Sequence, residues 1–588
     1  MRWSLNELYT SFSSEEYQND IIDFEKLIQE INLWAESQLK DMTNLVEKLE
    51  KYIHYTTKAN NLGVKLMVFA SLTNAVDSSD NQALNYLNKV NVMTNELTKP
   101  TVLFQNFLKD IDNLDNTINS STLLKEHRFF IESSREKALF MLSEKEEVLI
   151  SKLTTTGSTA WSNLQNKISS TLLVDITLDG ENKKLPLPVI RNLAYNKDPL
   201  VRKVAYEAEL ESYKKIQESS GAAINGIKGE VITLAKMRGF ESPLHEVLVK
   251  SRMDKETLDA MLMAMEEFLP VFQKYYKRKG EILGHNNGLP FYDLFAPVGS
   301  IDKEFSYKEA MEYVISNFRT FSDKLADYTK NAYEKNWLDV EPREGKRGGA
   351  FCSNIHPIGE SRIMSNFNGS FSNMTTLAHE LGHGYHGLNL KDESILNSRY
   401  PMPIAETASI FCETIVVNAA LEEATEEEAF AILEESLSGS GQVIVDIFSR
   451  YLFETELFKT REDHPLSVDE LKDMMIKAQK KAYGDGLDHD FLHPYMWINK
   501  PHYYSAGLNF YNFPYAFGLL FAKGLYAKYL DNKEEFLKSY DDLLTATGKN
   551  SIVDVAKKIG VDVHDPEFFR SSLRLIEKDI EKFLELSN

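Results

Sequence analysis

The residues best suited to chemistry form the run HELGH at positions 379–383, in which two histidines stand four positions apart. Four residues of α-helix rotate by ~400°, so the imidazoles of His379 and His383 lie one turn apart on one face and can share a tetrahedral metal ion. Glu380 then lies beside the open coordination position, where it can act as a base without being a ligand. The pattern predicts a catalytic metal centre on a helix that begins near Ser372 or Asn373.

A catalytic zinc needs a third protein ligand, and position 389 is Asn, so no HExxHxxGxxH continuation is present. The candidate is Glu406, in a downstream helical segment whose apolar flanks predict partly buried carboxylates that need a cation. Glu413 follows two turns later on nearly the same face and could orient a ligand histidine through a hydrogen bond. His386 continues the first helix but lies too far along its axis for this metal, so we expect a structural role or one that supports a metal ligand.

Several further segments surround these residues: GAFC (349–352), NFNG (366–369), TLAHELGHGYH (376–386), ETASIFCE (406–413), HPYMW (493–497) and, upstream, RNLAYNKDPLVRKVAYEAE (191–209). Together they resemble the oligoendopeptidase F family, within the thimet-oligopeptidase-like metallopeptidases. The resemblance implies a largely helical, two-lobed fold around a deep channel with zinc at its floor. It also implies hydrolysis of unstructured peptides, with folded proteins excluded.

Matched position by position, the resemblance implies that His379, His383 and Glu406 bind the metal and that Glu380 is the base. The family's strand that binds the substrate backbone would fall on the segment 348–353, whose predicted contacts are Gly348, Gly349, Ala350 and Phe351. An ordinary glycine loop is the alternative for that segment.

An aromatic stretch, PHYYSAGLNFYNFPYAFG at 501–518, forms a second candidate group. Attack on a peptide carbonyl creates an oxyanion, which a histidine and tyrosine hydroxyls can stabilise. The family uses a histidine followed by tyrosines for this purpose, and His502 matches the histidine. The spacing to the tyrosines is longer than in the family pattern, so the role could fall to Tyr504, Tyr511 or Tyr515, of which Tyr511 is the first choice. Core packing is the alternative for such a stretch.

Composition and charge limit the function classes. The 588 residues are 43% hydrophobic and 26% charged, which predicts a folded chain. The net charge of −22 opposes binding to nucleic acid or anionic membranes. Two cysteines are too few to stabilise a chain of this size by disulfides, which fits a reducing compartment. The N-terminus lacks the apolar stretch of a secretion signal. No apolar run approaches the ~18 residues of a membrane span. We therefore expect a cytoplasmic protein.

Helical periodicity dominates the chain; for example, one face collects Phe24, Leu27, Ile28, Ile31 and Ala35. Two regions are predicted to be extended: 172–178 with 185–188 around an Asp-Gly turn, and 348–353 with 363–368. We expect a mainly α, two-lobed helical metallopeptidase with a deep central channel and a small β-sheet beside the zinc helix. The turn-rich segment 180–199 predicts a boundary between a helical N-terminal domain (1–190), ending in a β-hairpin, and a catalytic domain (191–588).

The sequence therefore predicts an endopeptidase that binds one Zn²⁺ per chain and cleaves short, unstructured oligopeptides, with Glu380 as general base. Two alternatives remain. One is a zinc carboxypeptidase-like exopeptidase of related helical fold, and the other is a non-catalytic peptide-binding protein. Oligopeptides are the expected partners, and neither nucleic acid nor membrane is. Cleavage-site preference and oligomeric state cannot be read from these residues.

Overall fold

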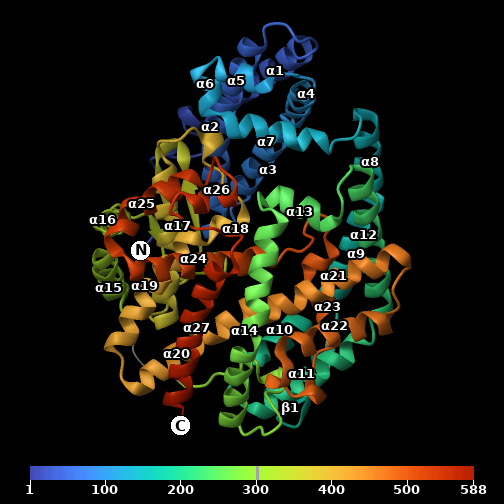
Figure 1. Ribbon diagram of the computed structural model, residues 1–588, viewed down its shortest axis with the longest axis vertical. Coiled ribbons are helices and arrows are strands. Elements are labelled where there is room, and N and C mark those ends of the chain that lie inside the picture. Colours follow the sequence, from blue (N-terminus) through green and yellow to red (C-terminus); the bar gives the residue numbers. More distant parts are fainter. Residues whose placement is uncertain (300–303, 588) are drawn as a thin grey trace. The chain divides into compact units, whose positions relative to one another are not determined.

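The computed structural model describes residues 1–299 and 304–587, and helices make up most of it (Figure 1). The chain folds into two compact units. Unit 1 comprises residues 1–141, 303–419 and 528–561, and unit 2 comprises residues 142–302, 420–527 and 562–588. Each unit is thus assembled from three separate stretches of chain. The sequence-based division at residue 190 into two continuous domains stays a prediction.

Unit 1 is a set of helices that pack around two hydrophobic clusters. Its elements are α1 (Glu15–Gln38), α2 (Leu45–Val76), α3 (Asn81–Asn95), α4 (Thr98–Lys109), α5 (Leu114–Asn119), α6 (Thr122–Glu126), α7 (Arg128–Leu139), α15 (Tyr307–Phe321), α16 (Asp323–Glu334), β3 (Leu338–Asp339), β4 (Phe351–Ile355), β5 (Glu360–Met364), α17 (Phe371–Leu390), α18 (Met402–Ala405), most of α19 (Thr407–Glu423), α25 (Lys533–Ala546) and α26 (Ile552–Lys557).

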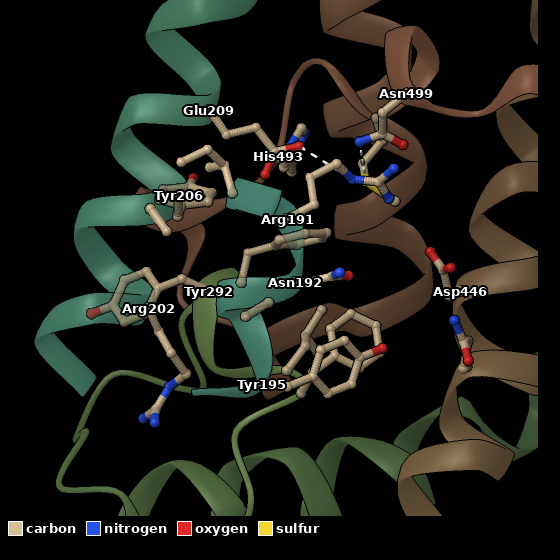
Figure 2. Close-up of a pocket in the computed structure, with 18 of the residues that line it drawn as sticks. Arg191, Asn192, Tyr195, Arg202, Tyr206, Glu209, Tyr292, Asp446, His493 and Asn499 are labelled. Carbon is tan, nitrogen blue, oxygen red and sulfur yellow. Dashed lines mark hydrogen bonds and ion pairs between the residues drawn. The ribbon is translucent and has the colours of Figure 1, made fainter. Parts of the chain in front are cut away.

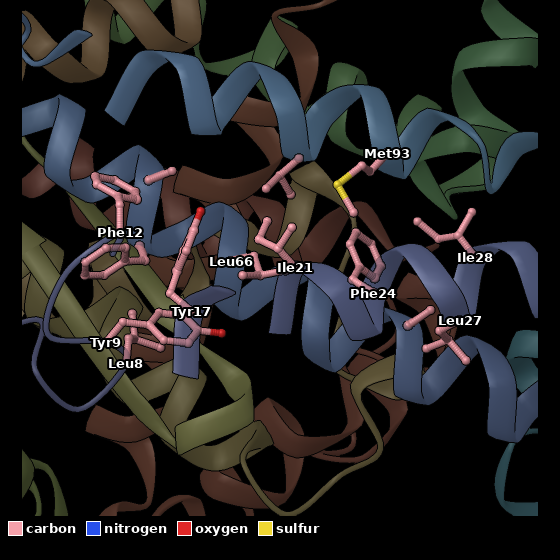
Figure 3. Packing of buried hydrophobic residues seen from close by; sticks show 14 of the residues in the cluster. Leu8, Tyr9, Phe12, Tyr17, Ile21, Phe24, Leu27, Ile28, Leu66 and Met93 are labelled. Carbon is pink, nitrogen blue, oxygen red and sulfur yellow. The ribbon is translucent and has the colours of Figure 1, made fainter. Parts of the chain in front are cut away.

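Helix α1 illustrates how the sequence forms these elements. The hydroxyl of Ser14 accepts a hydrogen bond from the amide of Tyr17 and caps the helix, which satisfies one of its free N–H groups. Side chains at helical spacing then pack inward against α2 and α3 (Figure 3). The predicted apolar face is confirmed, because all five of its members are buried: Phe24, Leu27, Ile28, Ile31 and Ala35.

Unit 2 contains α8 (Glu144–Thr156), α9 (Ser158–Ser170), β1 (Leu173–Leu178), β2 (Glu181–Pro186), α10 (Leu187–Asn192), α11 (Pro199–Tyr213), α12 (Gln217–Met237), α13 (Pro243–Ser251), α14 (Lys255–Ile282), α20 (Glu426–Gly441), α21 (Ile447–Asp463), α22 (Val468–Tyr483), α23 (Met496–Asn499), most of α24 (Phe513–Asp531) and α27 (Pro566–Leu586). The terminal helix α27 runs alongside α14 (Figure 1). Buried ion pairs cross-link the unit, including Lys228 with Glu454 at 2.9 Å and Lys279 with Glu434 at 2.6 Å.

The two predicted extended regions both form antiparallel strand pairs. β1 and β2 pair through a turn at Asp179 and Gly180, whose positive φ values of 53° and 79° are those of a tight hairpin turn. In unit 1, β5 lies between β3 and β4, so β4 is an edge strand of this sheet. The second region was predicted with shifted bounds, because β4 begins only at Phe351 and β5 ends at Met364.

One helical segment is longer and more apolar than the sequence-based expectation stated. Met402–Glu423 is long and apolar enough to cross a membrane by length and composition alone. Half of its most apolar window is buried within the structure. The buried core helices of globular proteins share this composition, so the segment is weak evidence for a membrane.

Glycines let α17 approach its neighbours closely. A Cβ at Gly382 would lie 2.6 Å from the carbonyl oxygen of Ala408 and from Cα of Ser409 in α19. A Cβ at Gly384 would overlap the hydroxyl of Tyr328, and one at Gly387 would lie 2.3 Å from the side chain of Asn354. Because backbone cannot yield as a side chain can, the close approach at Gly382 sets the spacing between α17 and α19.

Gly382→Ala should therefore force apart the two helices that carry the predicted metal ligands. We expect a loss of about 1–3 kcal/mol in the free energy of unfolding, measured by urea denaturation, together with weaker zinc binding in a chelator competition. Gly439→Ala is the matched control, because its Cβ would meet nothing within 4 Å inside α20. It should leave stability unchanged or raise it by up to about 1 kcal/mol. Equal stability of the two variants would contradict the packing argument.

Candidate metal centre

Helix α17 presents the two predicted histidine ligands side by side. Its N-cap is Ser370, whose hydroxyl accepts a hydrogen bond from the amide of Asn373 at 3.2 Å. The predicted start at Ser372 or Asn373 was therefore late, because the extended backbone of Ser370 already ends the preceding loop. The imidazole rings of His379 and His383 lie 4.9 Å apart and nearly perpendicular, as predicted for residues one turn apart.

Glu406 completes a cluster of three donors. It lies at the junction of α18 and α19, and its Oε2 is 3.2 Å from Nε2 of His379 and 3.5 Å from Nε2 of His383. Tetrahedral ligands at ~2.1 Å from a zinc-sized ion are separated by ~3.4 Å, so both distances from Glu406 suit a shared metal, and all three donor atoms lie within 4.8 Å of one another. All three side chains are about one-fifth exposed, which leaves the fourth position accessible.

Glu413 holds His379 from the side away from Glu406. Its Oε2 is 3.0 Å from Nδ1 of His379. A proton on Nδ1 would be donated to this carboxylate, which leaves the lone pair of Nε2 for a metal and fixes the direction of the ring. The structure thus brings Glu413 to the place that its spacing from Glu406 predicted.

The charges of the cluster call for a cation. Burial opposes protonation of His379, but hydrogen bonds to Glu406 and Glu413 raise the pKa of His379 to about 10. Burial and the positive charge of His379 lower the pKa of His383 to about 4. Burial also disfavours ionised Glu406, yet the neighbouring histidines hold the pKa of this carboxyl at about 2. The two carboxylates therefore favour the protonated form of His379. A bound metal ion could supply the positive charge in place of that proton.

Glu380 lies next to the ligands but outside the donor set. Its side chain is buried, with 7% of the residue exposed. Burial raises the pKa of Glu380 to about 7, although the charge of His379 and a hydrogen bond from the backbone of Cys352 oppose this rise. A carboxyl group with a pKa near neutrality can both accept and return a proton, as a general base must.

Asn354 is a supporting residue that sequence reasoning missed. Its side-chain amide on β4 donates a hydrogen bond to the backbone carbonyl of His383 at 3.0 Å, and it accepts one from the hydroxyl of Ser361 at 2.8 Å. This bond joins the small sheet to α17. The sequence feature that could have indicated this contact is Gly387, because the absence of a side chain there leaves room on α17 for the Asn354 side chain.

Of the two roles open to His386, its contacts match the structural one. It is fully buried, and its Nε2 lies 2.8 Å from the hydroxyl of Thr547. Its ring stacks on Tyr400 at a centroid distance of 4.1 Å. It does not belong to the three-residue donor cluster found among the described residues.

The residues predicted to stabilise an oxyanion all belong to unit 2, whereas the metal ligands belong to unit 1. His502 lies in a short helical turn at Pro501–Tyr504, and its ring centroid is 5.6 Å from that of Tyr511. The hydroxyls of Tyr511 and Tyr515 are 2.7 Å apart. Tyr504 differs from these two, because it is 1% exposed and burial raises its pKa well above the ordinary value.

The predicted substrate segment is partly a strand. Gly348, Gly349 and Ala350 precede β4, and Gly349 has a φ of +80°, which favours glycine. The side chain of Asn366 donates hydrogen bonds to the carbonyls of Arg347 and Gly349 and so holds this loop. Phe351 begins β4, whose second edge is not paired with another described strand.

Sequence comparisons place the chain among peptidases. The profile of peptidase family M3 matches residues 192–575, and that of oligopeptidase F matches residues 110–172. Oligopeptidase PepF of Bacillus subtilis (strain 168) is 25% identical, over 99% of this chain and 87% of that protein. The oligoendopeptidase F homolog of Borreliella burgdorferi is also 25% identical, over 99% of this chain and 97% of that protein.

Solved structures share the fold. A Chlamydophila abortus protein assigned as a peptidase superposes with a TM-score of 0.87 at 21% identity, covering 100% of this chain and 98% of that one. Oligoendopeptidase-F from Enterococcus faecium superposes with a TM-score of 0.71 at 19% identity, covering 97% of this chain and 99% of that one. Because the family M3 profile spans well over half of the residues and the oligopeptidase F profile precedes it, the chain belongs to peptidase family M3, in its oligoendopeptidase F branch.

Proposed function

We propose that this peptidase is a zinc-dependent endopeptidase that hydrolyses short, unstructured oligopeptides in the cytoplasm. The observation that carries the proposal is the cluster of His379, His383 and Glu406 with the buried carboxyl group of Glu380 beside it. Two imidazole nitrogens and one carboxylate oxygen are a donor set that favours zinc, and three protein ligands leave a position open for reaction.

A zinc ion held by these three residues would supply a Lewis acid that polarises the scissile carbonyl and makes water more acidic. Glu380 takes a proton from the attacking water and then delivers it to the leaving amine. Glu413 keeps the ring of His379 in its binding orientation throughout. Each of these roles needs a fixed geometry, which the close packing of α17 supports.

We assign stabilisation of the oxyanion to His502 and Tyr511. Burial and the charges of Arg450, Lys228 and Lys500 lower the pKa of His502 to about 3, so its imidazole is neutral and carries one N–H donor. Tyr515 supports Tyr511 through their short hydroxyl contact, and the complete burial of Tyr504 makes it the least suitable of the three tyrosines.

We assign binding of the substrate backbone to the loop at 348–350 and the start of β4. The backbone of Cys352 hydrogen-bonds to Glu380. Ala350 directly precedes β4, and its N–H and C=O would be available to an extended peptide at this edge. An extended peptide could add to this edge by main-chain hydrogen bonds, which accept many side chains.

The first prediction from the proposed mechanism concerns the reaction. A peptide of about ten residues, blocked at both ends, should be cut internally, and cleavage should stop with a chelator and return with zinc. Glu380→Gln should keep stoichiometric zinc but lose kcat by a factor of roughly 10² to 10⁴, because the variant has no general base. Mass spectrometry of the products and metal analysis of the protein check these outcomes.

Two results would contradict the proposed endopeptidase activity, and a third would contradict only the role of Glu380. Release of terminal residues alone, from unblocked peptides, would indicate the exopeptidase alternative. A zinc-loaded protein that leaves a mixed peptide library intact would indicate a binding protein. Wild-type turnover by Glu380→Gln would remove only the assignment of the base.

The second prediction concerns Glu413. Glu413→Ala removes the acceptor on Nδ1 of His379, so zinc affinity should fall roughly 10- to 100-fold in a chelator competition. Activity should recover at high zinc concentration, since the three ligands remain. Glu422→Ala is the matched control, an exposed glutamate on the same helix, and should bind zinc like the wild type. Equal zinc affinity in both variants would show that Glu413 does not orient the ligand.

A further inference from the structure

Unit 2 contains a cavity of about 280 Å³ that the assigned chemistry does not use (Figure 2). It lies among α10, α11, the loop after α14, the end of α20 and the segment that contains α23. This volume is at the lower end for small-molecule sites, so it suits a ligand about the size of one aromatic ring with a short chain.

Tyrosine and phenylalanine side chains form a large apolar part of the cavity wall. Tyr206, Phe291 and Tyr292 lie on one side, and Tyr195 and Phe295 pack against each other with ring centroids 5.2 Å apart. Aromatic side chains bury large apolar areas and contact other rings in stacked or edge-on arrangements. The walls therefore favour an aromatic or otherwise planar apolar group.

His493 supplies a buried polar group at this cavity. It is 2% exposed, and neither ring nitrogen has a hydrogen-bond partner among the described residues. Glu209 is the nearest acceptor, at 3.6 Å from Nε2, which is too long for a hydrogen bond. The side chain of Gln479 holds the backbone of His493 through two hydrogen bonds, at 2.8 and 3.0 Å. A buried group of this kind lacks a partner that a ligand could provide.

The charges that line the cavity leave one cation uncompensated. Arg202 is paired with Asp293 at 2.6 Å, Arg191 is 3.6 Å from Glu209, and Asp446 is paired with Arg450. Lys500 has no ion pair among residues 1–299 and 304–587. Burial lowers the pKa of Lys500 to about 8, and the charge of Arg450 adds to this shift while the carboxylates of Asp446 and Glu209 oppose it.

We propose that this cavity binds a small aromatic carboxylate, with its ring against the aromatic walls and its carboxylate on Lys500 and His493. The ammonium of Lys500 provides the charge, and His493 provides a hydrogen-bond donor fixed in direction. The same chemistry is offered by a free aromatic acid and by the C-terminal residue of a peptide. The inference rests on unit 2 alone and holds whether or not the proposed peptidase mechanism is right.

Calorimetry on the full chain tests the proposal. The protein is first treated with a chelator, because a carboxylate could otherwise bind to the metal centre. The probes are 3-phenylpropionate, its neutral amide and acetate, which separate the contributions of ring and charge. We expect saturable binding of 3-phenylpropionate, with the amide and acetate each weaker by roughly tenfold or more. The peptides Ala-Ala-Phe with a free or an amidated C-terminus then show whether a peptide end can enter.

Three variants locate the site. Lys500→Met should weaken 3-phenylpropionate by roughly tenfold or more, whereas Lys500→Arg, which keeps the charge, should retain binding. Lys480→Met, an exposed lysine on α22, is the matched control and should bind like the wild type. His493→Phe keeps the ring but removes both nitrogens, so it provides a second loss of binding if Lys500→Met fails to fold.

Some outcomes would overturn the proposal. These are no saturable binding of 3-phenylpropionate, equal affinity for the acid and its amide, or unchanged affinity in both Lys500→Met and His493→Phe. Binding of the free acid alone and binding of the free-ended peptide as well would both support the site and would identify its source of ligand.

Discussion

The metal centre depends on the balance of charge between two imidazoles and two carboxylates that share a half-buried space. Glu406 and Glu413 approach His379 from opposite ring nitrogens, at 3.2 and 3.0 Å. Such a group is stable only with positive charge at its centre, and partial burial makes the electrostatic requirement stronger than it would be in water. The fold of unit 1 therefore has to bring α17 and α19 together at a fixed separation.

Close packing meets that requirement. The glycines of α17 let backbone approach backbone at Ala408 and Ser409, and they make room for Tyr328 and Asn354. The small sheet takes part, since Asn354 on β4 bonds to the carbonyl of His383 and the backbone of Cys352 bonds to Glu380. The candidate ligands, the proposed base and the edge strand are thus positioned by one connected set of interactions, and a change in any one of them would affect the others.

In unit 2, the buried charges of the described residues are mainly balanced by ion pairs between side chains and not by a candidate metal site. Most of its buried ions are paired, as Lys228 is with Glu454 and Arg202 is with Asp293. Lys500 and His493 stand apart from this pattern, because Lys500 has no ion pair among the described residues, the ring nitrogens of His493 have no hydrogen bond and only a 3.6 Å contact with Glu209, and both residues line one cavity. Unpaired buried polar groups are costly, so their concentration at a single cavity is better explained by a ligand than by packing.

The sequence by itself determined the helical class of the fold and predicted the residues of the candidate metal centre. The spacing of His379 and His383 follows from the period of a helix, the two turns from Glu406 to Glu413 follow from the same period, and the Asp179-Gly180 turn follows from backbone sterics. These are local constraints, and a single chain without coordinates expresses them fully.

Only the tertiary structure decided what depends on interactions between distant segments. The assembly of each unit from three stretches of chain, the bond from Asn354 to α17, and the cavity around Lys500 all join residues far apart in sequence. The N-cap of α17 at Ser370 and the start of β4 at Phe351 also depended on hydrogen bonds of the folded chain. Periodicity cannot specify such interactions, because it records the face on which a residue lies and not the element that will cover it.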